Sequence, residues 1–361
     1  MRVLYLLRYF PTLTETFVYR EIDALRELGV EVIIAALGRR SDGDLQGELP
    51  RAQVLRVPRH PIAGRLAAAG PGQRWLSQVR GRAEGARLAW LRQTLPPVDR
   101  LHAHFAGGAA EWARALALDL GIPWSVTVHA VDLFKPRPSL DLLLAEAHPV
   151  VTVARHHQAL LAERGARSSL VRCGPDLARW DLGPPPDGPL HALAVGRNVP
   201  KKGLDLLLAA WSELDRPQAR LTLVSDMADP GMPGVTVTGL LPPAGVREAM
   251  SRANTVVLPC RRAPDGDMDG VPVSLMEGLA ASRPAISTTV SGIPELVDTS
   301  VGWLLPPEDP AALVDALRAA HDDPAERRRR GARGPARLAE EGFSAPVQAR
   351  RLLAAWTASG A

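Results

Sequence analysis

Apolar and polar residues follow two alternating patterns along this chain. Residues 3–7 form a short apolar run, and residues 14–28 then place apolar side chains three to five positions apart, ending at Gly29. A short apolar run is typical of a buried strand, whereas the wider spacing is typical of a helix with one apolar face. Glycine after the last apolar position is a common helix end. The sequence therefore opens with a strand followed by a helix.

The same alternation continues to the end of the chain. It predicts an α/β fold with two doubly wound, Rossmann-like domains that face each other across a cleft. No segment of 20 to 50 residues repeats, which argues against a solenoid. Further strands are expected at residues 30–37, 99–105, 124–130, 149–154, 168–173, 191–197, 219–225, 235–239, 254–260 and 283–288, and helices near 202–214, 243–252, 272–281 and over most of 310–356.

A stretch rich in proline and glycine separates the two halves. We expect a first domain at residues 1–174, a linker at 175–189 and a second domain at 190–341. Such composition is usual where few contacts cross between domains. The remaining residues, 342–361, are expected to form a C-terminal helix that packs back on the first domain.

Composition limits the class of protein. No apolar run approaches the roughly 18 residues that cross a bilayer, and the first apolar run is too short for a signal peptide, so we expect a cytoplasmic protein. The two cysteines, Cys173 and Cys260, do not fit a disulfide framework or a CxxC metal site. A net charge of +4 with 4% aromatic residues does not favour nucleic-acid binding.

An acidic loop, DGDMDGVPVSLMEG, places Asp269 and Glu277 eight residues apart. A calcium loop would begin with Asp265, Asp267, Asp269 and Gly270, but its twelfth position is methionine instead of glutamate. A second interpretation is an ordinary helix that begins at Pro272, with carboxylates close to its positive end.

A third interpretation uses both carboxylates. The free backbone N–H groups of Val273 and Ser274 at the helix start are suited to a diphosphate. Asp269 and Glu277 would then accept hydrogen bonds from sugar hydroxyls on either side of it. We favour this interpretation, in which the loop binds a nucleotide sugar.

The segment VGRNVPKKG supports the same conclusion. A strand ends at Gly196, and Arg197 and Lys202 follow before the next helix. Cations placed there would neutralise a diphosphate and stabilise it as a leaving group. Taken singly, each could equally be a solvated surface residue.

These segments resemble a known family. VGRNVPKKGLD, VTVTGLLP, VVLPC, DGVPVSLMEGLA and SGIPELV, in that order, are similar to the donor domain of family 4 glycosyltransferases with the GT-B fold. FPTLTETFVYREIDALRELGVEV, HAHFA and TVHAVD are similar to the exopolysaccharide and colanic-acid branch. The resemblance implies a retaining hexosyltransferase that needs neither a metal nor a cofactor. It would move a sugar from a nucleotide-diphosphate donor to a glycan or polyprenyl-linked acceptor.

The resemblance also implies residue roles. Asp269 and Glu277 would bind the donor sugar and the ribose, with Asp in place of the family's first Glu, and Arg197 and Lys202 would bind the diphosphate. The shorter Asp269 and the segment VSDM at 224–227, which lacks the family's glycines, depart from the pattern.

Histidines of the first domain allow several interpretations. His102 and His104 share one face of a strand, and together with His129 they could bind zinc. Alternatively His102 is a core residue bonded to backbone carbonyls. By resemblance His129 lies beside the donor sugar, and His104 and Glu15 lie on the acceptor side. Glu15 is equally well explained as a residue at the start of a helix.

Residues 59–100 carry nine Arg or His residues against Glu84 and Asp99 only. Two interpretations fit this segment: a helix pair packed on its own domain, or a basic surface that rests on anionic lipid near the acceptor. Arg80, Arg82 and Arg87 are the cations expected to make that contact.

The sequence also leaves other functions to consider. A double-displacement glycosidase would not need the phosphate-binding pair. A nucleotide-sugar-binding protein without turnover and a nucleotide-sugar epimerase of the same fold would be told apart by their reaction products.

Overall fold

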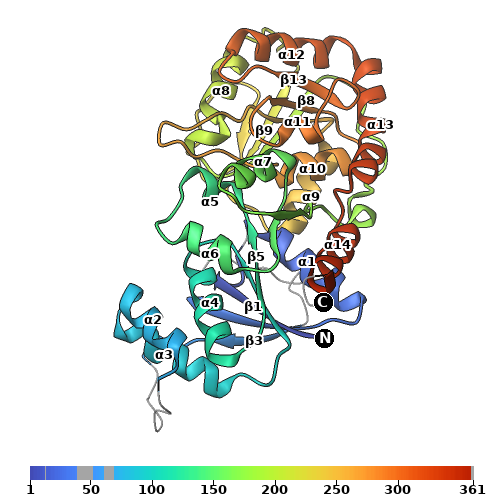
Figure 1. The fold of residues 1–361 in the computed structure, drawn as a ribbon. Helices are drawn as coiled ribbons and strands as arrows, with labels where there is room; N and C mark the ends of the chain where they lie inside the picture. Colours follow the sequence, from blue (N-terminus) through green and yellow to red (C-terminus); the bar gives the residue numbers. More distant parts are fainter. Residues whose placement is uncertain (13, 39–51, 61–68, 359–361) are drawn as a thin grey trace. The chain divides into compact units, whose positions relative to one another are not determined.

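The computed structural model describes residues 1–12, 14–38, 52–60 and 69–358 (Figure 1). The chain divides into two compact units. Unit 1 is assigned Met1–Val153, His157–Val171 and Gln348–Ala361, and unit 2 is assigned Ala154–His156 and Arg172–Val347.

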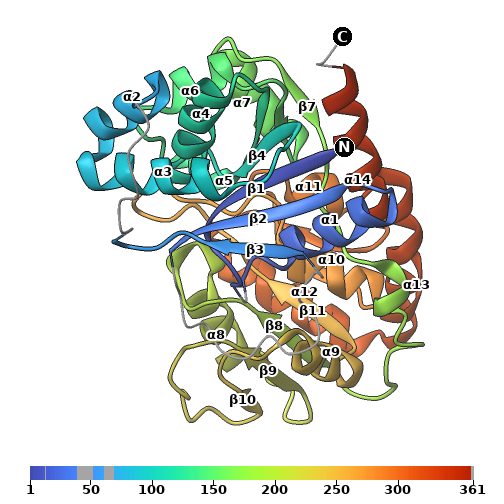
Figure 2. The same ribbon diagram turned by 90° about the horizontal axis from the view of Figure 1, so that it is seen from below.

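Unit 1 is built on a parallel sheet with the strand order β3-β2-β1-β4-β5-β6-β7. Figure 2 shows β1, β2 and β3 side by side. The register sets Tyr5 on β1 beside His102 on β4. The strands are β1 (Arg2–Tyr9), β2 (Glu31–Gly38), β3 (Gln53–Arg56), β4 (Arg100–His104), β5 (Trp124–Val128), β6 (Val150–Thr152) and β7 (Ser168–Leu170).

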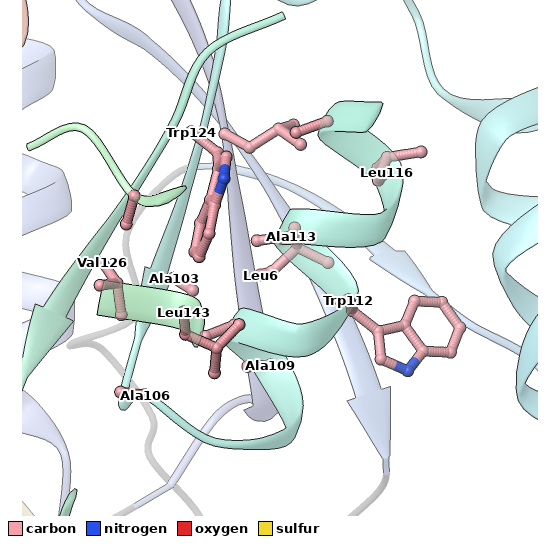
Figure 3. Close-up of a cluster of buried hydrophobic side chains, with 14 of the residues drawn as sticks. Leu6, Ala103, Ala106, Ala109, Trp112, Ala113, Leu116, Trp124, Val126 and Leu143 are labelled. Atoms are coloured by element: carbon pink, nitrogen blue, oxygen red, sulfur yellow. The ribbon is translucent and has the colours of Figure 1, made fainter. Parts of the chain in front are cut away.

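Helices cover this sheet. They are α1 (Thr16–Glu27), α2 (Pro71–Arg80), α3 (Arg82–Thr94), α4 (Gly108–Leu120), α5 (Ala130–Phe134), α6 (Leu140–Glu146), α7 (Arg155–Glu163) and α14 (Ala345–Ala358). The core forms where α4 meets the middle strands, because its small residues, such as Ala113, let the helix approach Leu6 and Val126 (Figure 3). Burying one such Leu or Val side chain stabilises the fold by about 1.5–3 kcal/mol.

The last helix, α14, returns to unit 1. Trp356 donates its indole N–H to the Ser125 hydroxyl at 2.9 Å, and its carbonyl accepts a hydrogen bond from Arg100. In Figure 1 α14 lies beside α1, and Gln348 on α14 donates to Glu21 on α1. Satisfied buried polar groups of this kind fix the position of the helix on the domain.

Unit 2 repeats the architecture with the parallel strand order β10-β9-β8-β11-β12-β13. Its strands are β8 (His191–Val195), β9 (Arg220–Val224), β10 (Val235–Val237), β11 (Thr255–Leu258), β12 (Ala285–Thr288) and β13 (Gly302–Leu305). Its helices are η1 (Leu177–Trp180), η2 (Pro200–Lys202), α8 (Leu204–Ser212), α9 (Pro243–Arg252), α10 (Val273–Ala280), α11 (Ile293–Leu296), α12 (Pro310–Asp322) and α13 (Pro324–Glu341).

Both sheets reverse their strand order at one point. In unit 1 the reversal lies between β1 and β4, and in unit 2 it lies between β8 and β11. In open α/β sheets ligands bind just beyond the carboxyl ends of the strands at such a point. A ligand site is therefore expected in the loops that follow these four strands.

The structure corrects several sequence-based boundaries. Strands β3 and β13 and helix α11 were not expected. Residues 154–156 and 172–174, expected in the first domain, belong to unit 2, as do 342–347. The expected linker at 175–189 contains η1, with a buried Trp180, and is part of unit 2. Within the described residues, no helix has the length and apolar character needed to span a bilayer.

Residues 71–94 form a helix pair packed on its own domain, which was one of the two interpretations of residues 59–100. Leu76, Leu88 and Leu91 belong to the core of unit 1, so the apolar residues of α2 and α3 mostly face inward. Arg87 is paired with Glu84 and also bonds backbone carbonyls, while Arg80 pairs with Glu111. These two arginines hold the helices to the domain. Further residues of this segment, 61–68, lie outside the described part of the chain.

Candidate active site

In unit 2 the loop after β8 positions a lysine. Gly196 follows the strand, and a β-carbon added there would lie 3.3 Å from the Lys202 side chain, so glycine lets that side chain pack across the loop. The short η2 helix ends at Gly203, whose φ is 65°. A β-carbon on Gly203 would lie 2.1 Å from the Pro259 carbonyl oxygen. The two glycines thus bring Lys202 against the loop that follows β11.

That second loop carries the acidic residues. Lys202 Nζ lies 2.8 Å from Asp269 Oδ2. Lys201 Nζ lies 3.6 Å from Asp269 Oδ1 and 3.1 Å from Asp267 Oδ2. The Cys260 thiol donates to Asp269 Oδ2 at 3.5 Å. Two of the chain's three lysines therefore meet the carboxylates that a calcium loop would use as ligands.

The ion pair controls the charge of both partners. Burial alone would raise the pKa of Asp269, but Lys202 and then Lys201 lower it. Burial alone would lower the pKa of Lys202, but Asp269 raises it. Burial, and then the Asp269 charge, raises the pKa of Cys260. Near neutral pH the site therefore holds an ammonium, a carboxylate and a neutral thiol.

Helix α10 begins immediately after the acidic loop. Pro272, expected as its first helical residue, is its N-cap, so the helix begins one residue later, at Val273. The Pro272 carbonyl accepts from the Leu275 and Met276 N–H groups. Val273 and Ser274 are partly exposed, and among the described residues no backbone partner meets their N–H groups. Glu277 is on the same helix and is buried. The start of α10 can thus receive an anion.

Arg197 and Gly270 complete the set expected in unit 2. Arg197 is exposed, directly after Gly196. Gly270 accepts a hydrogen bond from Gly292 N–H at 3.2 Å, which ties the acidic loop to the loop after β12. Asp226, in the unusual segment VSDM, accepts the Asn198 N–H at 2.6 Å. This carboxylate anchors the loop that carries Arg197, although the segment lacks the glycines of the family pattern.

In unit 1 three side chains form a line. His129 follows β5 and is the N-cap of α5. Its Nε2 lies 3.1 Å from His104 Nδ1, and His104 Nε2 lies 2.9 Å from Glu21 Oε1. The side chain of His104 is fully buried. The expected contact of His104 with an acceptor is therefore not supported, because its ring nitrogens meet Glu21 and His129 instead.

Electrostatics shift the pKa values of Glu21, His129 and the neighbouring Asp132. Burial by itself would raise the pKa of Glu21, but the interactions with His104, His102 and Tyr5 lower it to about 2. Burial lowers the pKa of His129 well below its usual value, and the three neighbouring histidines add to the effect. Burial raises the pKa of Asp132, on α5, to about 6 despite its backbone hydrogen bonds.

His102 lies beside the line. Its Nδ1 contacts the Ser125 hydroxyl at 2.9 Å and its Nε2 contacts the Thr127 hydroxyl at 3.1 Å. The expectation of backbone carbonyl partners was wrong, because these hydroxyls on β5 take their place. Among the described residues one group could hold a metal ion, namely Glu21, His102 and His104. This group differs from the three histidines that the sequence offered as one interpretation.

Sequence reasoning missed several of these residues. Glu21 was overlooked although it is in the apolar stripe of α1, between the buried Val18 and Ile22. A carboxylate at such a position is a signal of a buried partner. Lys201 was passed over for its neighbour Lys202. Glu15 is the N-cap of α1, without a capping bond from its side chain.

Comparisons with known proteins agree with this geometry. Residues 14–179 match the family model "Glycosyltransferase Family 4", and residues 189–323 match the model "Glycosyl transferases group 1". Together the two matches take in most of both units. The chain belongs to family 4 of the glycosyltransferases.

Within this family the chain is similar to enzymes of exopolysaccharide synthesis. It is 29% identical to the colanic acid biosynthesis glycosyltransferase WcaL of Escherichia coli (strain K12), over 88% of this chain and 90% of WcaL. It is also 29% identical to the amylovoran biosynthesis glycosyltransferase AmsK of Erwinia amylovora, over 60% of this chain and 59% of AmsK.

A solved structure shows the same fold. The Anabaena protein Alr3699/HepE, determined with UDP and glucose, matches 99% of this chain and 100% of its own with a TM-score of 0.76, at 15% identity. The expected GT-B fold is thereby confirmed for this family 4 glycosyltransferase.

Proposed function

We propose that this glycosyltransferase moves a hexose from a nucleotide-diphosphate donor, with retention of configuration and without a metal ion. The observation that carries the proposal is the pair Lys202–Asp269, at the carboxyl ends of β8 and β11. The start of α10 follows directly. A cation, a carboxylate and free N–H groups are what the reacting end of such a donor requires.

Each group has one role in this proposal. Lys202 and Arg197 stabilise the negative charge that develops on the leaving diphosphate, together with the N–H groups of Val273 and Ser274. Asp269 and Glu277 accept hydrogen bonds from the hydroxyls of the donor sugar and of the ribose. Because protein cations neutralise the diphosphate, a divalent metal is not required.

Relatives indicate the substrate class. HepE has also been solved with UDP-glucose, and WcaL and AmsK are named for colanic acid and amylovoran. We therefore propose a nucleotide sugar as donor and a glycan or polyprenyl-linked acceptor in the synthesis of a cell-surface polysaccharide. We further propose that the enzyme works in the cytoplasm, close to the inner face of the plasma membrane.

A donor screen tests the proposal. UDP-, GDP- and ADP-sugars are added singly, and the thermal unfolding midpoint is measured. A ligand at 100 times its Kd should stabilise the protein by about 2.7 kcal/mol. The donor that stabilises is then incubated with protein, and the products are separated.

The products separate the alternatives. A transferase releases the nucleoside diphosphate, slowly when water accepts the sugar and quickly when an acceptor molecule does. An epimerase returns a changed nucleotide sugar, and a binding protein returns the donor unchanged. Either of the last two results would contradict the proposal.

A further inference from the structure

A buried hydrogen-bonded chain in unit 1 ends at His129. It begins at Tyr5 on β1, whose hydroxyl donates to Glu21 Oε1 at 2.6 Å. Gln348 on α14 donates to the other oxygen of the same carboxylate. Glu21 contacts His104 on β4, and His104 contacts His129. Four secondary-structure elements therefore converge on the ring of one histidine.

The direction of each hydrogen bond follows from the groups at the two ends of this series of hydrogen bonds, Glu21 and the backbone of Asp132. An ionised carboxylate only accepts hydrogen bonds, so His104 must present an N–H at Nε2 to Glu21. A neutral His104 then has a lone pair on Nδ1, which accepts from His129 Nε2. At the other end, the backbone N–H of Asp132 donates to the His129 side chain in the capping box of α5. That bond requires a lone pair on the remaining ring nitrogen, Nδ1. Both ends therefore place the proton of His129 on Nε2.

The ring of His129 is held in place as well. Its centroid is 4.4 Å from that of Phe105 and 5.0 Å from that of Phe17. Asp132 accepts the His129 backbone N–H at 2.9 Å. Neither ring nitrogen is therefore available to take a proton from an acceptor hydroxyl.

We propose that Glu21 and His104 are positioning residues of the transfer reaction, holding His129 as the neutral tautomer with its proton on Nε2. His129 then contributes an oriented, uncharged ring beside the donor sugar, and not a general base. This inference rests on the proposed function and on the family resemblance, which implies that His129 lies beside the donor sugar. It adds two residues that touch neither substrate and a tautomer that can be observed.

The wild-type protein provides the first test. Imidazole ¹⁵N spectra of histidine-labelled protein, assigned with a His129→Gln variant, are recorded at neutral pH. We expect Nε2 of His129 in the protonated range and Nδ1 in the unprotonated range. The reverse pattern, or an averaged pair of shifts, would overturn the proposal. This measurement needs neither a donor nor activity, so it stands even if the proposed function fails.

Kinetics provide the second test. Glu21→Leu puts an apolar side chain in place of the carboxylate and removes the acceptor, and we expect kcat to fall by about 100-fold, as when a reacting group is misplaced by about 1 Å. The donor KM should change little, because the diphosphate and ribose are bound in unit 2. Glu21→Gln keeps an oxygen that can accept from His104 and should recover most of the loss.

A matched control separates positioning from simple disturbance of the core. Thr127→Val removes a hydroxyl that contacts His102 in the same buried cluster. This hydroxyl is not one of the hydrogen-bonded groups that lead from Glu21 to His129. It should leave kcat and the His129 spectrum near those of wild type. If Glu21→Leu were as active as Thr127→Val, or if Thr127→Val lost as much activity as Glu21→Leu, the positioning role would be wrong.

Discussion

Lys202 Nζ and Asp269 Oδ2 are 2.8 Å apart, so the cation proposed to bind the diphosphate is paired with the carboxylate proposed to bind the sugar. Lys201 adds a second contact to that carboxylate at 3.6 Å. Under the proposed function, the diphosphate would replace Asp269 as the partner of Lys202, and the sugar hydroxyls would replace Lys202 as partners of Asp269.

This relationship divides the roles of the two carboxylates. Asp269→Ala frees Lys202, so binding of the nucleoside diphosphate alone should be kept or strengthened while transfer is lost. Glu277→Ala should weaken binding of both the nucleoside diphosphate and the nucleotide sugar, because its partner is the ribose. Calorimetry with the nucleoside diphosphate measures both. Equal losses in the two variants would refute the division.

The cations should differ in importance. Lys202→Ala or Arg197→Ala should each cost about 2–4 kcal/mol of transition-state stabilisation, as expected when one preorganised donor is lost. Lys201→Ala is the matched control, because Lys201 is bonded mainly to Asp267. Its effect on kcat/KM should be clearly smaller. A loss as large as that of Lys202→Ala would move the diphosphate contact to Lys201.

Gly203 should be required at its position. Gly203→Ala places an L-residue at positive φ and drives its β-carbon into the Pro259 carbonyl. Gly121→Ala has a similar φ of 69° but meets no atom within 4 Å, so it shows the cost of the backbone angle alone, about 1–2 kcal/mol. Urea unfolding should show the larger loss for Gly203→Ala, and only this variant should weaken donor binding. Equal losses would show that the loop yields to the β-carbon.

Two carboxyls of unit 1 should give opposite pH dependences. The pKa of Glu21 is lowered to about 2, so its stabilisation is complete above pH 4.5 and is lost as the pH falls toward 2. The pKa of Asp132 is raised to about 6, so its contribution falls as the pH rises from 3.8 to 6. Urea unfolding across pH 4–7 should show that the free energy of unfolding of Asp132→Asn rises relative to that of wild type as the pH rises. A constant difference would contradict the raised pKa.

Attachment to anionic lipid stays a prediction, with Arg82 kept and with Arg74 and Val79 in place of Arg80 and Arg87. Val79 is 51% exposed, and Arg74 and Arg82 are exposed on α2 and α3. Each arginine close to such a surface contributes about 1 kcal/mol. Co-sedimentation with anionic vesicles should fall with added salt and with Val79→Glu plus Arg82→Glu. Wild-type protein that stays in the supernatant at low salt would rule this attachment out.

Much of the fold could be predicted because parallel strands buried on both faces leave continuous apolar runs. The runs around β1, β8 and β11 were found in this way. Strand β3 was missed because, at the edge of its sheet, none of its residues is fully buried and its apolar signal is weak. The short β13 was missed for a similar reason, since three of its four residues are only partly buried.

The meeting of Lys202 with Asp269 in unit 2 could be anticipated for a different reason. Both residues follow strands of one parallel sheet, and the carboxyl ends of such strands share one edge. The buried line in unit 1 could not, because its members come from α1, β4 and β5 and meet only through tertiary packing. Spacing along the sequence does not indicate that Glu21 contacts His104, 83 residues later.

Release of the nucleoside diphosphate is the most direct test of the central claim, that Lys202 and Asp269 form a metal-independent donor site. Wild type, Lys202→Ala and Lys201→Ala are incubated with the nucleotide sugar that gives the largest thermal shift, in EDTA and in added Mg²⁺. The account predicts equal release by wild type in both buffers, a small loss with Lys201→Ala and a severe loss with Lys202→Ala. Release that depends on Mg²⁺, or that survives Lys202→Ala unchanged, would contradict it.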